Sequence, residues 1–319
     1  MKLCRFSEGG ASRAGFFLDS HIVPLDAAAR IHQDRTHRPI TLPAGDDLLA
    51  LLPGGALHDA GRALGAWLAA NRGVADGVAI PVAKAQLLTP IARPPKIILL
   101  AGNYNEHIKE GGGRETERAK TFPYLFQKPV STTLNHPGAA VVIPAVSPNS
   151  IDWECELGVV MGRRCRHVKE AGALKFVAGY TVVNDISDRK FRPNPGREKR
   201  DKDSFFDWQH GKWHDTFCPV GPCVASSDAI PDPQKLKLTL KVNGKTWQDA
   251  TTAQMIFSVA AIIEFVSAIV TLEPGDIIST GTPAGVGNTT GTYLKPGDKM
   301  EAAIEGIGVL HNHMVAEKA

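Results

Sequence analysis

Residues 150–162, SIDWECELGVVMG, carry three acidic side chains at alternate positions, Asp152, Glu154 and Glu156. Because the side chains of a strand alternate between its two faces, the three carboxylates are predicted to share one face. The GVVMG run that follows is apolar on both faces, which is typical of a strand inside a sheet. Ionised carboxylates lose solvation there at a cost of several kcal/mol each. This face therefore either meets water or holds a cation.

Much of the remaining chain also has the pattern of strands, rich in Val, Ile and Thr or alternating with period two. The predicted strands are 97–102, 139–144, 153–162, 178–185, 236–244, 275–281 and 306–315. Only two long helices are predicted in this part, at 169–177 and 252–270, the second behind a Thr251-x-x-Gln254 capping box. The pattern predicts a β-dominated α+β fold rather than an alternating βαβ fold.

The first 92 residues differ in character and are predicted to form a small N-terminal α+β accessory domain. They begin with a strand pair and contain an Ala-rich helix near 56–73. Pro90, Pro94 and Pro95 then indicate a linker, so residues 93–319 are predicted to form a second, larger domain.

The composition excludes several classes of function. A net charge of +3 is too small to indicate a nucleic-acid or membrane-surface partner. Five irregularly spaced cysteines without a C-x-x-C pair favour reduced thiols in a cytoplasmic protein. The apolar stretch 255–272 contains Glu264 and is interpreted as a buried helix rather than a membrane span.

A metal site is one explanation of the acidic face, and an exposed edge strand is the other. Asp185 ends a second apolar strand, GYTVVND, and adds another carboxylate. Carboxylate oxygens without nearby histidine suit Mg²⁺ or Mn²⁺ rather than zinc, and they leave positions open for a chelating substrate. Burial of the strand favours the metal site. Asp152 is the weakest candidate ligand, since it also fits as the first residue of the strand.

The polar segment 103–120 follows the strand at 97–102 and contains three successive glycines, which favours a surface lid. His107 and Glu110 lie three residues apart within it, and on a helical turn they share one face. A carboxylate beside an imidazole fixes its tautomer, as in a general base. A surface histidine in a charged loop is the alternative.

Seven segments in order carry a family resemblance: AGNYNEHIKE, FPYLFQKP, DWECELGVVMG, GYTVVNDISDR, GKWHDTFCPVGP, VNGKTWQDATTAQMIF and TLEPGDIISTGTPAGVG. Together they resemble the fumarylacetoacetate hydrolase superfamily over roughly residues 93–319. The resemblance implies a mixed β-roll catalytic domain, a divalent metal and a homodimer. It also implies ligation of Mg²⁺ or Mn²⁺ by Glu154, Glu156 and Asp185.

The same resemblance implies roles for the surrounding side chains. His107 with Glu110 matches the lid pair that activates water. Lys212 matches a lysine near the metal. Thr216 matches a residue that lies behind the metal ligands. Arg189, Thr282 and Lys128 match residues that contact the substrate.

Two features depart from the family pattern. In some hydrolases of the family a glutamine follows the arginine of NDISDR by three residues, and this chain has Arg192 there. Residues 190–210 are also longer and more basic than in the simplest members. Their arginines are interpreted either as a solvated loop or as a site for a second substrate carboxylate.

A metal held by carboxylates suits a small 2-oxo or diketo acid whose developing enolate it stabilises. With the water-activating pair, the favoured reaction is C–C hydrolysis of an acylpyruvate or 1,3-diketo acid. The same metal-stabilised enolate also serves three alternative reactions. They are decarboxylation of oxaloacetate, keto–enol isomerisation, and isomerisation or hydration of a 2-oxo-alkenedioate. A non-catalytic metal- or carboxylate-binding module is the alternative from another class.

Overall fold

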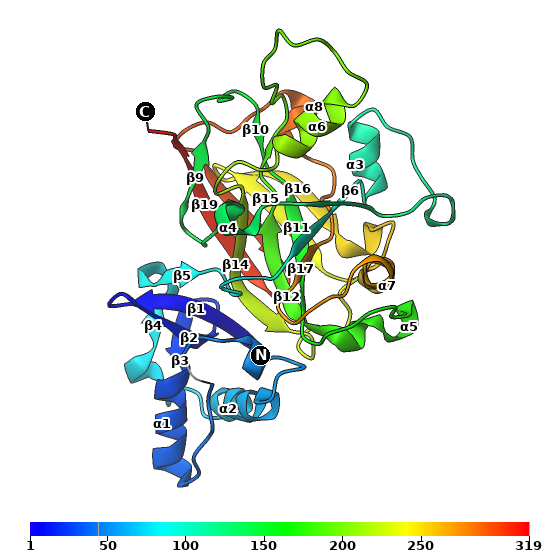
Figure 1. The fold of residues 1–319 in the computed structure, drawn as a ribbon. Coiled ribbons are helices and arrows are strands. Elements are labelled where there is room, and N and C mark those ends of the chain that lie inside the picture. The colour runs from blue at the N-terminus through cyan, green and yellow to red at the C-terminus, as the bar shows by residue number, and fades with distance from the viewer. Residues whose placement is uncertain (44, 319) are drawn as a thin grey trace.

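Two β-sheets form the framework of the chain, which the computed structural model describes over residues 1–43 and 45–318. The larger sheet has 12 strands, and its main path runs β4-β3-β2-β1-β14-β12-β11-β17-β6-β7, with β5 beside β1 and β8 beside β14 (Figure 1). Its strands beyond residue 92 are β6 Ile97–Ala101, β7 Tyr124–Gln127, β8 Leu134–Asn135, β11 Cys155–Met161, β12 Val177–Asn184, β14 Cys218–Ser226 and β17 Ile277–Ser279.

The second sheet has five strands in the order β16-β15-β18-β19-β9. They are β9 Ala140–Ile143, β15 Lys237–Val242, β16 Lys245–Thr251, β18 Lys299–Ile304 and β19 Gly308–Ala316. One hydrophobic cluster joins Val159 of β11 to Leu240 and Leu310 of this sheet. Val160, the next residue of β11, belongs to a second cluster that includes Leu3. The predicted burial of this strand on both faces is therefore confirmed, as is the β-dominated α+β fold.

The N-terminal residues form the far end of the larger sheet. Their elements are β1 Lys2–Glu8, β2 Ala11–Phe17, β3 His21–Pro24, α1 Leu25–Thr36, α2 His58–Ala70, β4 Ile80–Pro81 and β5 Gln86–Leu88. Strand β1 pairs antiparallel with β14, with Leu3 opposite Val224. The sheet thus crosses residue 92, and a domain boundary at that position remains a prediction. In Figure 1 this part, blue to cyan, lies at the end of the molecule opposite α3, α6 and α8.

The remaining helices are short. They are α3 Asn105–Glu110, α4 Val130–Thr133, α5 Glu170–Ala173, α6 Asp203–His210, α7 Val259–Ile269 and α8 Gly287–Thr290, with 3₁₀ turns at Leu49–Leu51, Asp76–Val78, Val82–Lys84, Arg118–Lys120, Leu174–Phe176 and Thr252–Gln254. No helix among the described residues has the length and apolarity that a membrane crossing requires.

The single helix predicted over 252–270 is wrong. The capping box of Thr251 and Gln254 is present, but it caps only a 3₁₀ turn, and α7 begins separately after Ser258. Asn103 holds the connection extended, because its backbone oxygen accepts from Ile256 N at 2.9 Å and its Oδ1 accepts from Phe257 N at 2.8 Å.

The prediction of one continuous strand with three acids on one face is also wrong at its start. Strand β10, Ile151–Asp152, pairs with β13, Ser187–Asp188, and the chain breaks before β11 begins at Cys155. Asp152 is held apart by donors of its own. Its Oδ1 accepts from Trp153 N at 2.8 Å and Gly287 N at 2.7 Å.

Candidate active site

Strand register brings three carboxylates together. In the antiparallel pair β11–β12, Cys155 lies opposite Asn184. The next residue outward on each strand is an acid, and Asp185 N donates to Glu154 O at 2.9 Å. Carboxylate oxygens of Glu154, Glu156 and Asp185 lie within 4.8 Å of one another, and all three side chains are buried. The pairing of two strands thus concentrates three acids in one place.

Strand β17 fixes Glu156 from the other side of β11. Glu156 Oε2 accepts hydrogen bonds from Ser279 Oγ at 2.5 Å and from Gly281 N at 2.9 Å. Gly281 has a φ of +89°, and a Cβ there would lie 2.9 Å from Asn103 Cβ. Only glycine presents its N–H to the carboxylate at this point without strain.

Three cationic side chains contact the acids. Lys212 Nζ donates to Glu154 Oε2 at 2.8 Å and to Asp185 Oδ2 at 2.6 Å. Arg189 Nη2 lies 2.6 Å from Glu154 Oε1, and Lys128 Nζ lies 2.5 Å from Asp185 Oδ1. The acids are therefore partly neutralised by the chain itself.

The neutralisation is uneven. Burial raises the pKa of Glu156 well above its ordinary value, and the charges of Asp185 and Glu154 raise it further. Burial acts in the same direction on Glu154, but Lys212 and Arg189 outweigh it and lower its pKa to about 2. Burial raises the pKa of Asp185, and the neighbouring lysines offset only part of the effect. Glu156 is thus the carboxylate that most lacks positive charge nearby.

The donor set fits a hard divalent cation. The three buried groups offer only carboxylate oxygens, close enough for one ion to contact all of them. Such oxygens are preferred by Mg²⁺ and Mn²⁺, whereas zinc sites favour nitrogen and sulfur. A divalent ion would also supply the charge that Glu156 lacks.

Helix α3 places a histidine beside this cluster. His107 Nδ1 lies 2.7 Å from Glu110 Oε1, and Glu110 Oε2 accepts from Gly285 N at 2.8 Å. An ionised carboxylate only accepts, so this contact assigns the imidazole hydrogen to Nδ1 and leaves Nε2 as the acceptor. The structure brings the predicted pair into contact, and its role in activating water remains a prediction.

A small cavity joins these groups. It measures about 60 Å³ and is lined by Leu100, Ala101, Gly102, His107, Phe126, Glu154, Arg189, Trp208, Lys212 and Thr282. Groups from separate segments of the chain, including His107, Glu154 and Thr282, thus meet at one cavity.

Comparison with known families decides the relationship. The model described as fumarylacetoacetate (FAA) hydrolase C-terminal matches residues 96–315. The chain belongs to the fumarylacetoacetate hydrolase family. The matched region contributes strands to both large sheets, and it contains all the lining residues of the small cavity.

Relatives within this family have different activities. A 2,4-didehydro-3-deoxy-L-rhamnonate hydrolase of Sphingomonas sp. (strain SKA58) is 37% identical over 313 residues, 97% of this chain and 94% of that protein. A mitochondrial oxaloacetate tautomerase of Rattus norvegicus is 37% identical over 238 residues, 74% of this chain and 71% of that protein. The solved maleylpyruvate hydrolase from Sphingobium sp. SYK-6, in complex with manganese(II) ion and pyruvate, has a TM-score of 0.71 and 28% identity, covering 100% of both chains.

Two of the substrate positions implied by the family likeness line the cavity. Arg189 reaches it while its Nε donates to Asp152 Oδ2 at 2.7 Å. Thr282 also lines it, although its Oγ1 donates to Cys155 O at 3.0 Å and accepts from Gln248 Nε2 at 2.8 Å. Both side chains are therefore held in fixed positions by the protein.

Lys128 and Thr216 make contacts of another kind. Lys128 Nζ donates to Ile186 O at 2.7 Å and Phe217 O at 2.6 Å besides pairing with Asp185, so its ammonium group is fully engaged by the protein. Thr216 Oγ1 accepts from Val142 N at 2.9 Å and ties its loop to β9. Within the described residues, neither side chain lines the small cavity, and their predicted roles remain predictions.

Two of the three arginines of the family-atypical segment 190–210 have partners within that segment. Arg197 Nη2 lies 2.6 Å from Asp207 Oδ2, and Arg200 Nε lies 3.2 Å from Asp203 Oδ1. Arg192 is exposed to solvent. Arg197 and Arg200 pair with acids of their own segment, so neither arginine is free to bind a second substrate carboxylate. The same ion pairs also give the segment more structure than a wholly solvated loop would have.

Sequence reasoning missed three residues of the site. Gln248 is buried, accepts from Cys155 N at 2.9 Å and donates to Thr282 Oγ1, so it links the acidic strand to the cavity wall. Phe126 and Trp208 line the cavity with their rings. Gln248 and Phe126 lie in the segments VNGKTWQDATTAQMIF and FPYLFQKP that carry the family likeness, whereas Trp208 lies in the departing segment and gave no signal.

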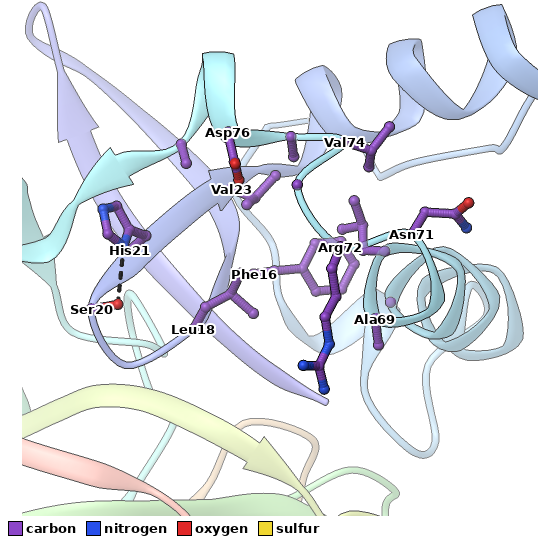
Figure 2. A pocket seen from close by; sticks show the side chains of 15 residues that line it. Phe16, Leu18, Ser20, His21, Val23, Ala69, Asn71, Arg72, Val74 and Asp76 are labelled. Atoms are coloured by element: carbon purple, nitrogen blue, oxygen red, sulfur yellow. Dashed lines mark hydrogen bonds between the residues drawn. The ribbon is translucent and has the colours of Figure 1, made fainter.

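A second cavity lies in the N-terminal part and is much larger, about 620 Å³ (Figure 2). Its floor includes Phe16 and Val23, and its wall includes the end of α2 and the residues after it. The labelled polar side chains at this cavity include His21, Arg72 and Asp76, and His21 lies beside Ser20 (Figure 2). No cluster of three metal-ligating groups occurs there among the described residues.

Proposed function

We propose that the chain is a divalent-metal-dependent hydrolase that cleaves a C–C bond of an acylpyruvate or another 1,3-diketo acid. The observation that carries this proposal is that His107, oriented by Glu110, lines the same small cavity as Glu154, Arg189 and Lys212. A proton acceptor and a charged cluster thus line one cavity, as acid–base catalysis requires.

Glu154, Glu156 and Asp185 would hold the ion, which is Mg²⁺ or Mn²⁺. When bound, such an ion acts as a Lewis acid toward the substrate oxygens. Support comes from the closeness of the three carboxylates and from the manganese in the maleylpyruvate hydrolase relative.

The remaining chemistry belongs to side chains of the chain. His107 Nε2 accepts a proton from water, and the resulting hydroxide adds to the acyl carbonyl of the substrate. The bond between that carbon and the adjacent methylene then breaks, and its electron pair moves onto the 2-oxo acid half as an enolate. His107 returns its proton to the methylene carbon, giving a carboxylic acid and a 2-oxo acid.

Two cationic side chains stabilise this charge. Lys212 and Arg189 line the cavity and place positive charge where the enolate forms. Glu110 keeps the imidazole in the tautomer that accepts the proton, and Gly285 N holds Glu110 in turn.

A tautomerase acting on an oxaloacetate-type acid is the second candidate. The cavity of about 60 Å³ fits a small acid, and the rat relative with 37% identity bears that activity in its name. In this reaction His107 moves a proton between carbon and the substrate oxygen without adding water.

An assay panel separates these candidates. The purified chain is tested on acetylpyruvate, oxaloacetate and 2-oxohept-3-ene-dioate with Mg²⁺, with Mn²⁺ and with EDTA. Release of acetate and pyruvate that requires the metal supports the hydrolase. Enol–keto conversion or decarboxylation of oxaloacetate without diketo-acid cleavage contradicts it. A non-catalytic binding module predicts no turnover on the whole panel.

A further inference from the structure

The segment that departs from the family pattern begins and ends in the small cavity. Arg189 precedes it and Lys212 follows it, and both line the cavity. The two ends are joined, since Asp188 N donates to Gly211 O at 2.8 Å. A Cβ on Gly211 would lie 2.3 Å from Asp188 O, so the ends approach as closely as glycine allows. The segment is therefore anchored at the site on both sides.

Arg197 stiffens the segment internally. Its guanidinium lies 3.1 Å from Asp203 Oδ2 at the first residue of α6 and 2.6 Å from Asp207 Oδ2 one turn later. Its Nη1 also donates to Pro193 O at 2.5 Å. One side chain thus ties the loop before α6 to two successive turns of the helix, with Trp208 the next residue.

Helix α6 delivers Trp208 to the cavity. The rings of Trp208 and Phe126 lie 4.9 Å apart at an angle of 66°. Lys212 Nζ lies 5.2 Å from the centre of the Phe126 ring and 5.9 Å from that of Trp208, within cation–π range. Since the same ammonium group binds Glu154 and Asp185, the two rings form a wall near the acids.

We propose that Trp208 determines substrate specificity, by limiting the length of the acyl tail that fits beside Phe126. This inference rests on the proposed function. A cavity of about 60 Å³ holds roughly four to six water-sized groups, about the size of a 2-oxo acid end, so it leaves little room for the acyl tail. A longer tail meets the indole ring, which α6 and Arg197 hold in place. The substrate class is therefore short-chain 2,4-dioxo acids.

The test compares two tail lengths in the presence of MnCl₂. Steady-state kinetics with 2,4-dioxopentanoate and 2,4-dioxooctanoate are measured for the wild type, Trp208→Ala, Trp208→Phe and Phe206→Ala. Phe206 lies on α6 but is solvent-exposed and absent from the cavity lining, so its variant is the matched control. In Trp208→Ala the ratio of kcat/KM for the longer acid to that for the shorter one rises tenfold or more, mainly through KM. Trp208→Phe gives an intermediate rise, and Phe206→Ala stays within twofold.

A binding measurement provides the second readout. Calorimetry with pyruvate and with 2-oxooctanoate follows the same variants, and Trp208→Ala tightens the longer acid tenfold while pyruvate changes less than threefold. Equal changes for both acids overturn the inference, as does a wild type that binds neither. If the wild type cleaves neither dioxo acid but the binding ratio shifts as expected, the proposed hydrolysis fails and the length limit stands.

Discussion

Two cavities among the described residues, one in the N-terminal part and one beside the acidic cluster, differ in size and in chemistry. The N-terminal one, about 620 Å³, has an apolar floor around Phe16 and polar side chains such as Arg72 at its surface (Figure 2). The other, about 60 Å³, is lined by charged groups that contact one another, the buried Glu154 and Lys212 and the partly buried Arg189. The larger cavity thus lacks the interacting charged groups that line the smaller one.

If the proposed function is correct, buried charge points to the reactive site better than volume does. Removing an ion from water costs several kcal/mol even after relaxation. A fold that buries Glu154, Glu156 and Asp185 within 4.8 Å of one another meets this cost, and Lys128, Arg189 and Lys212 offset only part of it. An open apolar cavity with exposed polar groups carries no comparable cost. The following paired variants test the contrast.

The largest effect is expected from the two histidines. His107→Ala removes the proton acceptor and should lower kcat on acetylpyruvate by roughly 10²–10⁴-fold, while the affinity for Mn²⁺ changes little. His21→Ala, in the larger cavity, should leave kcat within about twofold. Steady-state kinetics and calorimetric Mn²⁺ titration measure both. Equal activity of the two variants would remove His107 from the mechanism.

The two arginines should differ in stability. Arg189→Met leaves the buried Asp152 and Glu154 without their arginine partner and should lower the free energy of unfolding by about 3–5 kcal/mol. Arg72→Met, at the exposed cavity, should change it by no more than about 0.5 kcal/mol. Urea denaturation followed by circular dichroism gives both values. An Arg189→Met variant with an unchanged free energy of unfolding would contradict the idea that Arg189 stabilises the buried acids.

Two glycines with positive φ sharpen the comparison further. Gly281→Ala introduces strain and a Cβ 2.9 Å from Asn103 Cβ, and should cost about 1–3 kcal/mol while weakening Mn²⁺ binding through Glu156. Gly73→Ala has a similar φ of +81° but only an ordinary 3.5 Å contact with Asp76 Oδ2. It should cost less and leave Mn²⁺ binding unchanged. Thermal unfolding with and without MnCl₂ measures the difference, and equal losses of Mn²⁺ affinity would refute it.

The smallest effect concerns the junction between the N-terminal strands and the rest of the chain. Burial lowers the pKa of His136, and the charge of Arg5 lowers it further. The unfolded chain therefore binds the proton more readily, so stability should fall slightly as the pH drops below the ordinary histidine value of about 6.5. The fall should level off below the folded-state pKa.

His136→Gln should reduce this pH dependence, because the proton-binding group is gone while an acceptor for Thr89 N remains available. The urea midpoints of variant and wild type at pH 7.5 and 5.5 give the comparison. An unchanged pH dependence would assign the effect to other groups.

The sequence predicted the parts of the site that follow from local pattern. Alternation placed Glu154 and Glu156 together, the apolar GVVMG run indicated burial on both faces, and spacing paired His107 with Glu110. Each of these needs only the geometry of one strand or one helical turn. The same local reasoning also predicted most strands of both sheets.

The errors arose where distant residues decide the outcome. Asp152 leaves the acidic face because Arg189 and the backbone of Gly287 hold it, and neither contact is visible in strand alternation. Asn103 splits the predicted helix at 252–270 from more than 150 residues away. Trp208 reaches the cavity because its helix is anchored at both ends. The basic residues around it indicated a solvated loop or a carboxylate site and gave no sign of an aromatic cavity wall.

Crystallography with anomalous scattering tests most directly whether a cation explains the buried acids. Crystals grown with MnCl₂ should show one anomalous peak in contact with oxygens of Glu154, Glu156 and Asp185. A map without that peak, in which Lys212 alone neutralises the carboxylates or water separates them, would contradict the proposed metal site and the chemistry built on it.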